Sequence, residues 1–164
     1  MEVLLSVEAS VLSVDNLEAV DQRLSRGPFT HMVPSPNGKS LALLTMSGIL
    51  WVVSTDFQRN LAEFDSTSTG AEGPVRQVEW CGNDAILVTW DTLVLLVGPF
   101  GDTLQCVPLQ VSPYFTNTKQ RYYYAGPTFA VTEVDGVRVI AADACDLMQK
   151  VPGNKTFPQN QILC

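Results

Sequence analysis

Residues that could act in catalysis or bind a metal are few and widely separated in the sequence. A Ser-His-Asp hydrolase needs an imidazole to take the nucleophile's proton, and the sole histidine, His31, falls in an expected strand. We interpret His31 as structural or exposed. Paired-carboxylate chemistry would draw on Asp135, Asp143 and Asp146, but these occupy turn positions, where Asp side chains commonly bond their own backbone. We therefore assign no catalytic residue.

The cysteines and glycines form no recognisable ligand motif. The four cysteines, Cys81, Cys106, Cys145 and Cys164, are separated by 25, 39 and 19 positions, which matches neither a zinc nor a redox spacing. We interpret them as buried or incidental thiols. The segment 98–101 lacks the pattern of a phosphate loop or a dinucleotide fingerprint and predicts a hairpin loop. We assign no cofactor, metal or nucleotide.

The charge balance limits the classes of partner. There are 17 acidic and 10 basic residues, a formal net charge of −7, whereas nucleic-acid binding draws most of its affinity from Lys and Arg. Tyr122, Tyr123 and Tyr124 follow Lys119 and Arg121, a pairing that could stack on bases. Because the chain is so acidic, we interpret this segment as a strand and expect no nucleic-acid partner.

The three tryptophans, Trp51, Trp80 and Trp90, could act as exposed binding anchors, since aromatic residues dominate binding hot spots. Each lies within an apolar run, so we predict that they pack in the core.

With 164 residues and 46% apolar composition, the chain has the size of one domain with a core. The longest apolar run, 93–97, is far too short to cross a bilayer. Glu2 and Glu8 without a nearby cation argue against a secretory signal, so we expect a cytosolic protein.

Many short runs of Val, Leu, Ile and Trp bounded by turn residues predict strands. The expected strands are a pair within 3–14, then 40–46, 49–54, 60–64, 75–80, 85–90, 92–97, 103–107, 128–134, 137–142 and 145–151. Asp15 with Glu18 three positions later resembles a helix cap, which predicts a helix of two turns at most, ended by Gly27 and Pro28. The segments near 40–46, 49–54, 85–90 and 92–97 are apolar at nearly every position, as expected for strands covered on both faces.

A repeat is indicated by Gly48, Thr92 and Gly136, which lie 44 residues apart, each opening an apolar strand. Periods of about 40 to 50 residues are typical of β-propeller blades, although an ordinary β-sandwich also fits the turn spacing. We predict an all-β fold: a partial β-propeller of about three blades of four-stranded antiparallel sheet in an incomplete ring. Closed propellers have four to eight blades, so we expect a fragment.

Several segments together resemble the vacuolar protein sorting protein 16 family, in its N-terminal β-propeller and most closely in its fungal form. These are DQRLSRGPF (21–29), SPNGK (35–39), LWVVSTDFQ (50–58), QVEWCGNDAILVTW (77–90), VGPFGDT (97–103) and EVDGVRVIAADACDLMQKVP (133–152). They follow the family order over more than half of the chain. The chain departs from the family at 105–120, an expected loop insert, and at 153–164, an expected irregular tail.

The resemblance implies a non-enzymatic scaffold shared by the HOPS and CORVET tethers, which help endosomal and vacuolar (lysosomal) membranes to dock and fuse. It implies other class C tether subunits as protein partners, and a cytoplasmic location, peripheral on late endosome and vacuole membranes. It places the Sec1/Munc18-like subunit on a C-terminal solenoid that has no counterpart here.

We expect a partial propeller at 1–152, with blade-like repeats near 29–64, 75–107 and 121–152. A generic WD-repeat adaptor and a propeller enzyme with a channel site are the alternative functions. Because loops carry most function on rigid frames, we predict a binding face at the hairpin tips around Asn37 and Asp91.

Overall fold

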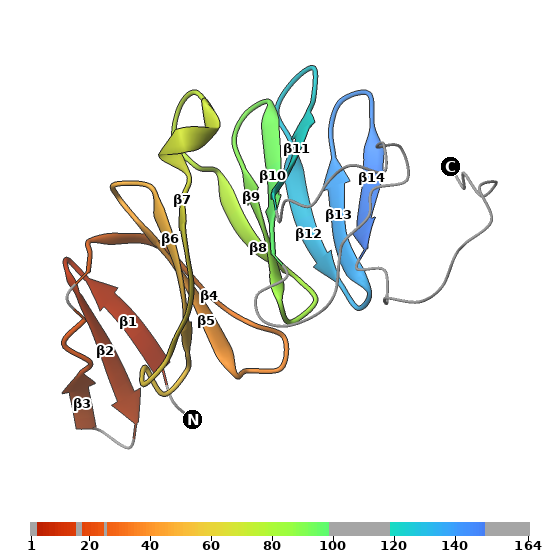
Figure 1. Ribbon diagram of the computed structural model, residues 1–164. Coiled ribbons are helices and arrows are strands. Elements are labelled where there is room, and N and C mark those ends of the chain that lie inside the picture. The colour runs from red at the N-terminus through yellow and green to blue at the C-terminus, as the bar shows by residue number, and fades with distance from the viewer. Residues whose placement is uncertain (1–2, 16–17, 25, 99–118, 150–164) are drawn as a thin grey trace.

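The protein is built almost entirely of β-strands. The computed structural model describes residues 3–15, 18–24, 26–98 and 119–149, whose path is drawn in Figure 1. Over these residues the strands form four antiparallel sheets, which we name A to D in chain order. Each sheet is a meander, because strands that follow one another in the sequence also pair.

The outer two sheets have three strands each and the inner two have four. Sheet A contains β1 (Val3–Val7), β2 (Ser10–Asp15) and β3 (Glu18–Asp21), and sheet B contains β4 (Phe29–Pro34), β5 (Ser40–Thr45), β6 (Ile49–Ser54) and β7 (Asn60–Asp65). Sheet C contains β8 (Gln77–Cys81), β9 (Ala85–Thr89), β10 (Leu93–Val97) and β11 (Lys119–Tyr123), and sheet D contains β12 (Phe129–Glu133), β13 (Gly136–Ile140) and β14 (Cys145–Gln149). One 3-10 turn, η1 (Thr67–Thr69), lies in the link from β7 to β8.

The four sheets follow one another face to face in an open arc (Figure 1). The first strands of sheets B, C and D are neighbours, since β8 contacts both β4 and β12. The indole Nε1 of Trp80 in β8 donates to the carbonyl oxygen of Val33 in β4 at 2.8 Å. On its other side β8 bonds β12, because the Gln77 side chain accepts from Ala130 N at 2.8 Å and donates to Ala130 O at 3.2 Å. Small antiparallel sheets joined through their first strands are blades, so the fold is a partial β-propeller, as predicted.

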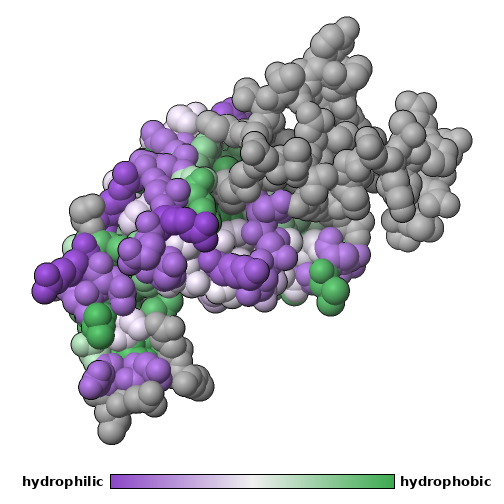
Figure 2. All heavy atoms as spheres, turned by 60° about the horizontal axis from the view of Figure 1, so that its bottom comes forward, coloured by the Kyte–Doolittle hydropathy of each residue, from purple (hydrophilic) through white to green (hydrophobic). Residues whose placement is uncertain are grey.

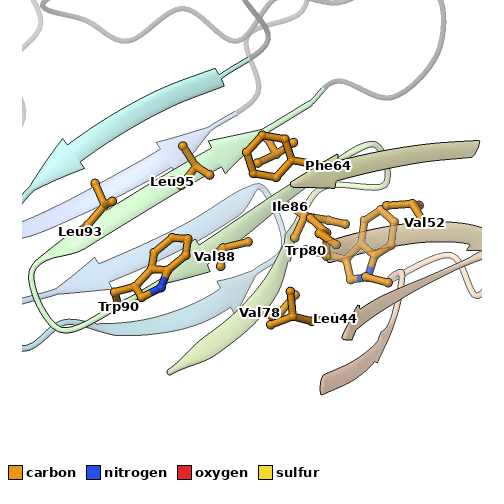
Figure 3. Packing of buried hydrophobic residues seen from close by; sticks show 13 residues of the cluster. Leu44, Val52, Phe64, Val78, Trp80, Ile86, Val88, Trp90, Leu93 and Leu95 are labelled. Carbon is orange, nitrogen blue, oxygen red and sulfur yellow. The ribbon is translucent and has the colours of Figure 1, made fainter. Parts of the chain in front are cut away.

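The core lies between the sheets rather than within one pair of layers. The largest cluster fills the space between sheets B and C (Figure 3), a second joins C to D, and a third joins A to B. Every residue of β9 and β10 is buried, because each of these strands has a neighbouring sheet on both sides. This confirms the interpretation of the continuous apolar runs as strands covered on both faces.

The predicted N-terminal helix is wrong. Residues 18–21 form β3, which pairs with β2 in the register Val14 to Ala19 and Leu12 to Asp21. A helix of two turns is marginal without tertiary support, whereas a third strand satisfies the free backbone edge of β2. The expected strand pair at 3–14 is therefore part of a three-stranded sheet.

The 44-residue spacing relates equivalent turns in sheets B and C but not in sheet D. Gly48 and Thr92 occupy equivalent turns, between the second and third strands of sheets B and C. Gly136 instead follows the turn between the first and second strands of sheet D. The expected repeat at 121–152 also begins too early, because residues 119–123 pair with β10 and belong to sheet C. The predicted strand at 103–107, the insert at 105–120 and the tail at 153–164 lie outside the described residues.

Candidate interaction surface

Asn37 stabilises a turn and ties two sheets together. Its Oδ1 accepts hydrogen bonds from Ser35 Oγ at 2.8 Å and from Lys39 N at 3.0 Å, so the side chain closes its own loop. Its backbone N–H donates to Asn83 Oδ1 at 3.0 Å, in the turn between β8 and β9. The loop is exposed, yet its amide is already engaged in holding the ends of sheets B and C together.

Asp91 lies in the turn between β9 and β10 and forms an ion pair. Arg76 Nε and Nη2 donate to the two carboxylate oxygens at 2.7 and 3.3 Å. These hydrogen bonds lower the pKa of Asp91 and raise that of Arg76. The pair bridges the start of β8 to the next hairpin, at an exposed position where such a contact contributes little stability.

Asn37 and Asp91 do not share one face. Successive turns of an antiparallel meander alternate between the two ends of the sheet, and the β4–β5 and β9–β10 turns are at different steps of the meander. Asn37 therefore lies with Asn83 at one end of the blades, and Asp91 lies at the other. Figure 2 brings the first of these ends forward and shows mostly hydrophilic side chains with small isolated hydrophobic spots.

Three of the other residues considered for chemistry, Tyr124, Asp146 and His31, have structural partners. The Tyr124 hydroxyl donates to Asp146 Oδ2 at 2.8 Å, and burial with this bond raises the pKa of Tyr124. His31 Nδ1 lies 3.1 Å from the hydroxyl of its neighbour Thr30. Asp135 and Asp143 are exposed in turns. In the described ranges no three His, Cys, Asp or Glu side chains are grouped closely enough to hold a metal ion.

The aromatic residues predicted to be core are divided between core and surface. Trp80 and Trp90 are buried, which confirms the prediction for both. Trp51 is only half-buried: its Nε1 donates to Asn60 Oδ1 at 3.0 Å, and the Arg26 guanidinium lies 5.2 Å from the ring centroid. The tyrosine segment is a strand, as predicted, with Tyr122 packed against the C–D core and Tyr123 exposed.

Several exposed apolar side chains gather on the outer faces of the two end sheets, while others, such as Met46, Tyr123 and Val134, lie elsewhere. Those on sheet A are Val3, Leu5 and Val7 of β1, which pair with Val14, Leu12 and Ser10 of β2. Leu4, on the opposite side of β1, packs against sheet B. We name the outward side of sheet A, formed by Val3, Leu5, Val7, Leu12 and Val14, the A end face.

The outward side of sheet D, which we name the D end face, contains Phe129, Val131, Ile140, Cys145 and Leu147, all exposed. An ion pair crosses it: Arg138 Nε and Nη2 donate to the Glu133 carboxylate at 2.5 and 3.1 Å. These bonds lower the pKa of Glu133 and raise that of Arg138.

Sequence reasoning missed both end faces. Alternation of Val3, Leu5 and Val7, and of Phe129 and Val131, was the available signal, but a strand pattern does not show whether a further sheet covers the face. Apolar groups gathered in this way mark interaction surfaces. In the part of the chain that the structure describes, no helix is long and apolar enough to span a bilayer.

Residues 1–157 match the family model described as "Vps16, N-terminal region". The chain is 33% identical over 153 residues to the probable vacuolar protein sorting-associated protein 16 homolog of Schizosaccharomyces pombe, covering 93% of this chain and 16% of that protein. It is 31% identical over 126 residues to Protein VACUOLELESS1 of Arabidopsis thaliana, covering 77% of this chain and 12% of that one. The chain thus spans about an eighth to a sixth of the length of these relatives.

Among solved structures, the Cps50 (Swd1) β-propeller domain of Myceliophteria thermophila overlaps 92% of this chain and 54% of its own, with 13% identity and a TM-score of 0.44. The fold assignment rests on the sheets described above and not on this structural similarity.

Proposed function

Since the chain belongs to the family of the Vps16 N-terminal region, we propose that it forms part of a non-enzymatic scaffold that acts in vacuolar protein sorting. The match over residues 1–157 is the observation that carries this proposal. The structure is compatible with it, because in the described part of the chain the polar side chains considered for chemistry hold turns and neighbouring sheets together. A frame of this kind presents surfaces to other proteins.

The finer assignment concerns the longer protein of which such a region forms part. We propose that it serves the HOPS and CORVET tethers in transport from endosome to vacuole or lysosome, with the other class C tether subunits as partners. Contact with late endosome and vacuole membranes would then come through the complex. The Sec1/Munc18-like subunit would bind elsewhere in the longer protein.

A chimera tests the proposal. In Schizosaccharomyces pombe cells, the aligned region of the native relative would be replaced by this chain, and vacuolar cargo sorting and co-purification of class C subunits would be measured. We expect the chimera to restore sorting and to retain its partners. A matched chimera with Trp80→Asp, which places a charge in the B–C core, should do neither. A chimera that is folded and abundant but restores neither property would refute the role.

A further inference from the structure

The turn between β4 and β5 contains an asparagine followed by a glycine, Asn37 and Gly38, and both residues are exposed. In such a pair the backbone nitrogen of the glycine can attack the side-chain carbonyl carbon of the asparagine. The two groups belong to adjacent residues, which favours reaction between them, and a glycine has no Cβ to shield its nitrogen. Gly38 has a φ of +66°, and a Cβ built on it would meet nothing within 4 Å. The surroundings therefore leave room for the ring that this attack forms.

The folded turn holds both reacting groups in hydrogen bonds. The Gly38 N–H donates to the carbonyl oxygen of Ser35 at 2.8 Å. The Asn37 Oδ1 accepts from Ser35 Oγ at 2.8 Å and from Lys39 N at 3.0 Å. Ser35 is buried, so water does not readily replace it as a partner. Because the Gly38 nitrogen must give up its proton and the Asn37 amide must rotate toward it, the turn has to open before the two groups react.

We propose that Asn37 is a site of slow, spontaneous deamidation, and that opening of this turn sets its rate. The Gly38 nitrogen forms a bond to the Asn37 side-chain carbon, its proton leaves with the amide nitrogen as ammonia, and a succinimide ring remains. One water molecule then opens the ring at either carbonyl, which leaves aspartate or isoaspartate at position 37. The reaction requires no cofactor and no enzyme. This inference stands independently of the family's role in sorting.

The reaction should loosen the contact between sheets B and C. The backbone N–H of Asn37 donates to Asn83 Oδ1 at 3.0 Å, across the ends of the two sheets. Isoaspartate adds a methylene group to the main chain at position 37, so the turn no longer places the Gly38 N–H opposite the Ser35 carbonyl. Either product adds a negative charge to a chain whose formal net charge is already −7, and self-repulsion destabilises a compact state. We therefore expect an aged chain to be less stable than a fresh one.

Peptide mapping by mass spectrometry would measure the rate. Trypsin, which cuts after Arg26 and Lys39, releases the peptide 27–39, which contains a single asparagine. The full chain would be incubated at neutral pH, folded in buffer and unfolded in guanidinium chloride, and sampled over time. We expect conversion in the folded chain to be slower on the order of a hundredfold, since it waits for a local opening that breaks several hydrogen bonds. Methylation by an isoaspartyl methyltransferase would identify isoaspartate.

Two variants and a matched control test whether the turn sets the rate. Ser35→Ala removes the hydroxyl that bonds Asn37 Oδ1 and Ser40 N, and should speed conversion in the folded chain by about fivefold or more. Asn83→Ala removes the acceptor of the Asn37 N–H and should also speed it, which provides a second test if Ser35→Ala does not fold. Ser47→Ala, in the exposed turn between β5 and β6, should leave the rate unchanged. Circular dichroism would verify folding.

The unfolded chains provide the reference, because without the turn all variants should convert at the wild-type rate. The proposal is overturned if the folded wild-type chain converts as fast as the unfolded one, or if none of the folded chains converts. It is also overturned if neither Ser35→Ala nor Asn83→Ala speeds conversion, or if Ser47→Ala speeds it equally. Deamidated wild-type chain, once purified, should unfold at a lower urea concentration than fresh chain. An unchanged midpoint would refute the loss of contact between sheets B and C.

Discussion

Trp80 couples sheets B and C, so replacing it with phenylalanine should weaken the whole arc. The side chain is 2% exposed, and its Nε1 donates to Val33 O at 2.8 Å across the junction. Trp80→Phe removes the donor and leaves a part-buried carbonyl without that partner, which costs about 1–3 kcal/mol. The smaller ring adds a cavity term of about 1 kcal/mol. We expect a loss of about 2–4 kcal/mol in the free energy of unfolding.

Urea unfolding followed by far-UV circular dichroism would measure this loss, and Trp51→Phe is the matched control. Trp51 is half-buried, and its hydrogen bond and its Arg26 contact both lie near solvent. The control should cost about 1 kcal/mol or less. Equal losses for the two variants would show that the bond across the junction has no special role, and the coupling argument would fail. The comparison requires that the variants have the same m value, which is the slope of the unfolding free energy against urea concentration.

Three further substitutions test other contacts. Gln77→Ala removes both hydrogen bonds from β8 to the β12 backbone and should destabilise the chain by about 1–3 kcal/mol in urea unfolding. Gly98→Ala should cost well over the ~1 kcal/mol expected for Gly38→Ala, because a Cβ at Gly98 would lie 2.7 Å from backbone atoms where β9 begins, whereas one at Gly38 meets nothing. Asp91→Asn should lower the thermal midpoint slightly at neutral pH, because Arg76 depresses the pKa of that carboxyl.

The contacts of each residue determine the expected pH dependence and the choice of control variant. A carboxyl with a depressed pKa stabilises the fold above its ordinary pKa, and that stabilisation is lost as the pH falls through the folded value. The Asp91→Asn difference should therefore vanish in strong acid, and a difference that persists there contradicts the ion-pair explanation. Gln58→Ala, at an exposed loop position with only local bonds, is the control for Gln77→Ala. Equal losses for Gly98→Ala and Gly38→Ala would exclude crowding as the cause.

The strands buried on both faces were the most predictable part of the fold. Residues 49–54 are β6 with the expected bounds, and β9 and β10 lie within their expected runs. Their composition is dictated by burial alone, so local sequence suffices. The segment after Asp15 was not predictable in this way, because Asp15 and Glu18, which match a cap pattern, are instead paired partners in β2 and β3. Pairing with β2 decided the outcome.

The candidate sites were less predictable than the strands. Asn37 and Asp91 were correctly expected in loops, but the alternation of turns along a meander separates them, and that alternation depends on how many strands intervene. The exposure of the end faces was harder to predict, because it depends on whether another sheet packs against each face. Val139 and Ile140 are adjacent in β13 and both apolar, yet one is buried against sheet C and the other is exposed.

The sheets are propeller blades even though the predicted 44-residue period is not constant. Between sheets B and C the second strands start 45 residues apart (40 and 85), whereas between C and D they start 51 apart (85 and 136). The added length falls between β10 and β11, whose facing ends, 97 and 119, are much farther apart in sequence than those of β6 and β7, 54 and 60. A longer connection at the end of a sheet changes the spacing of residues without changing which strands pair. Strand order and two-sided burial therefore identify blades more securely than a constant period does, and the agreement of Gly136 with the 44-residue spacing was coincidental.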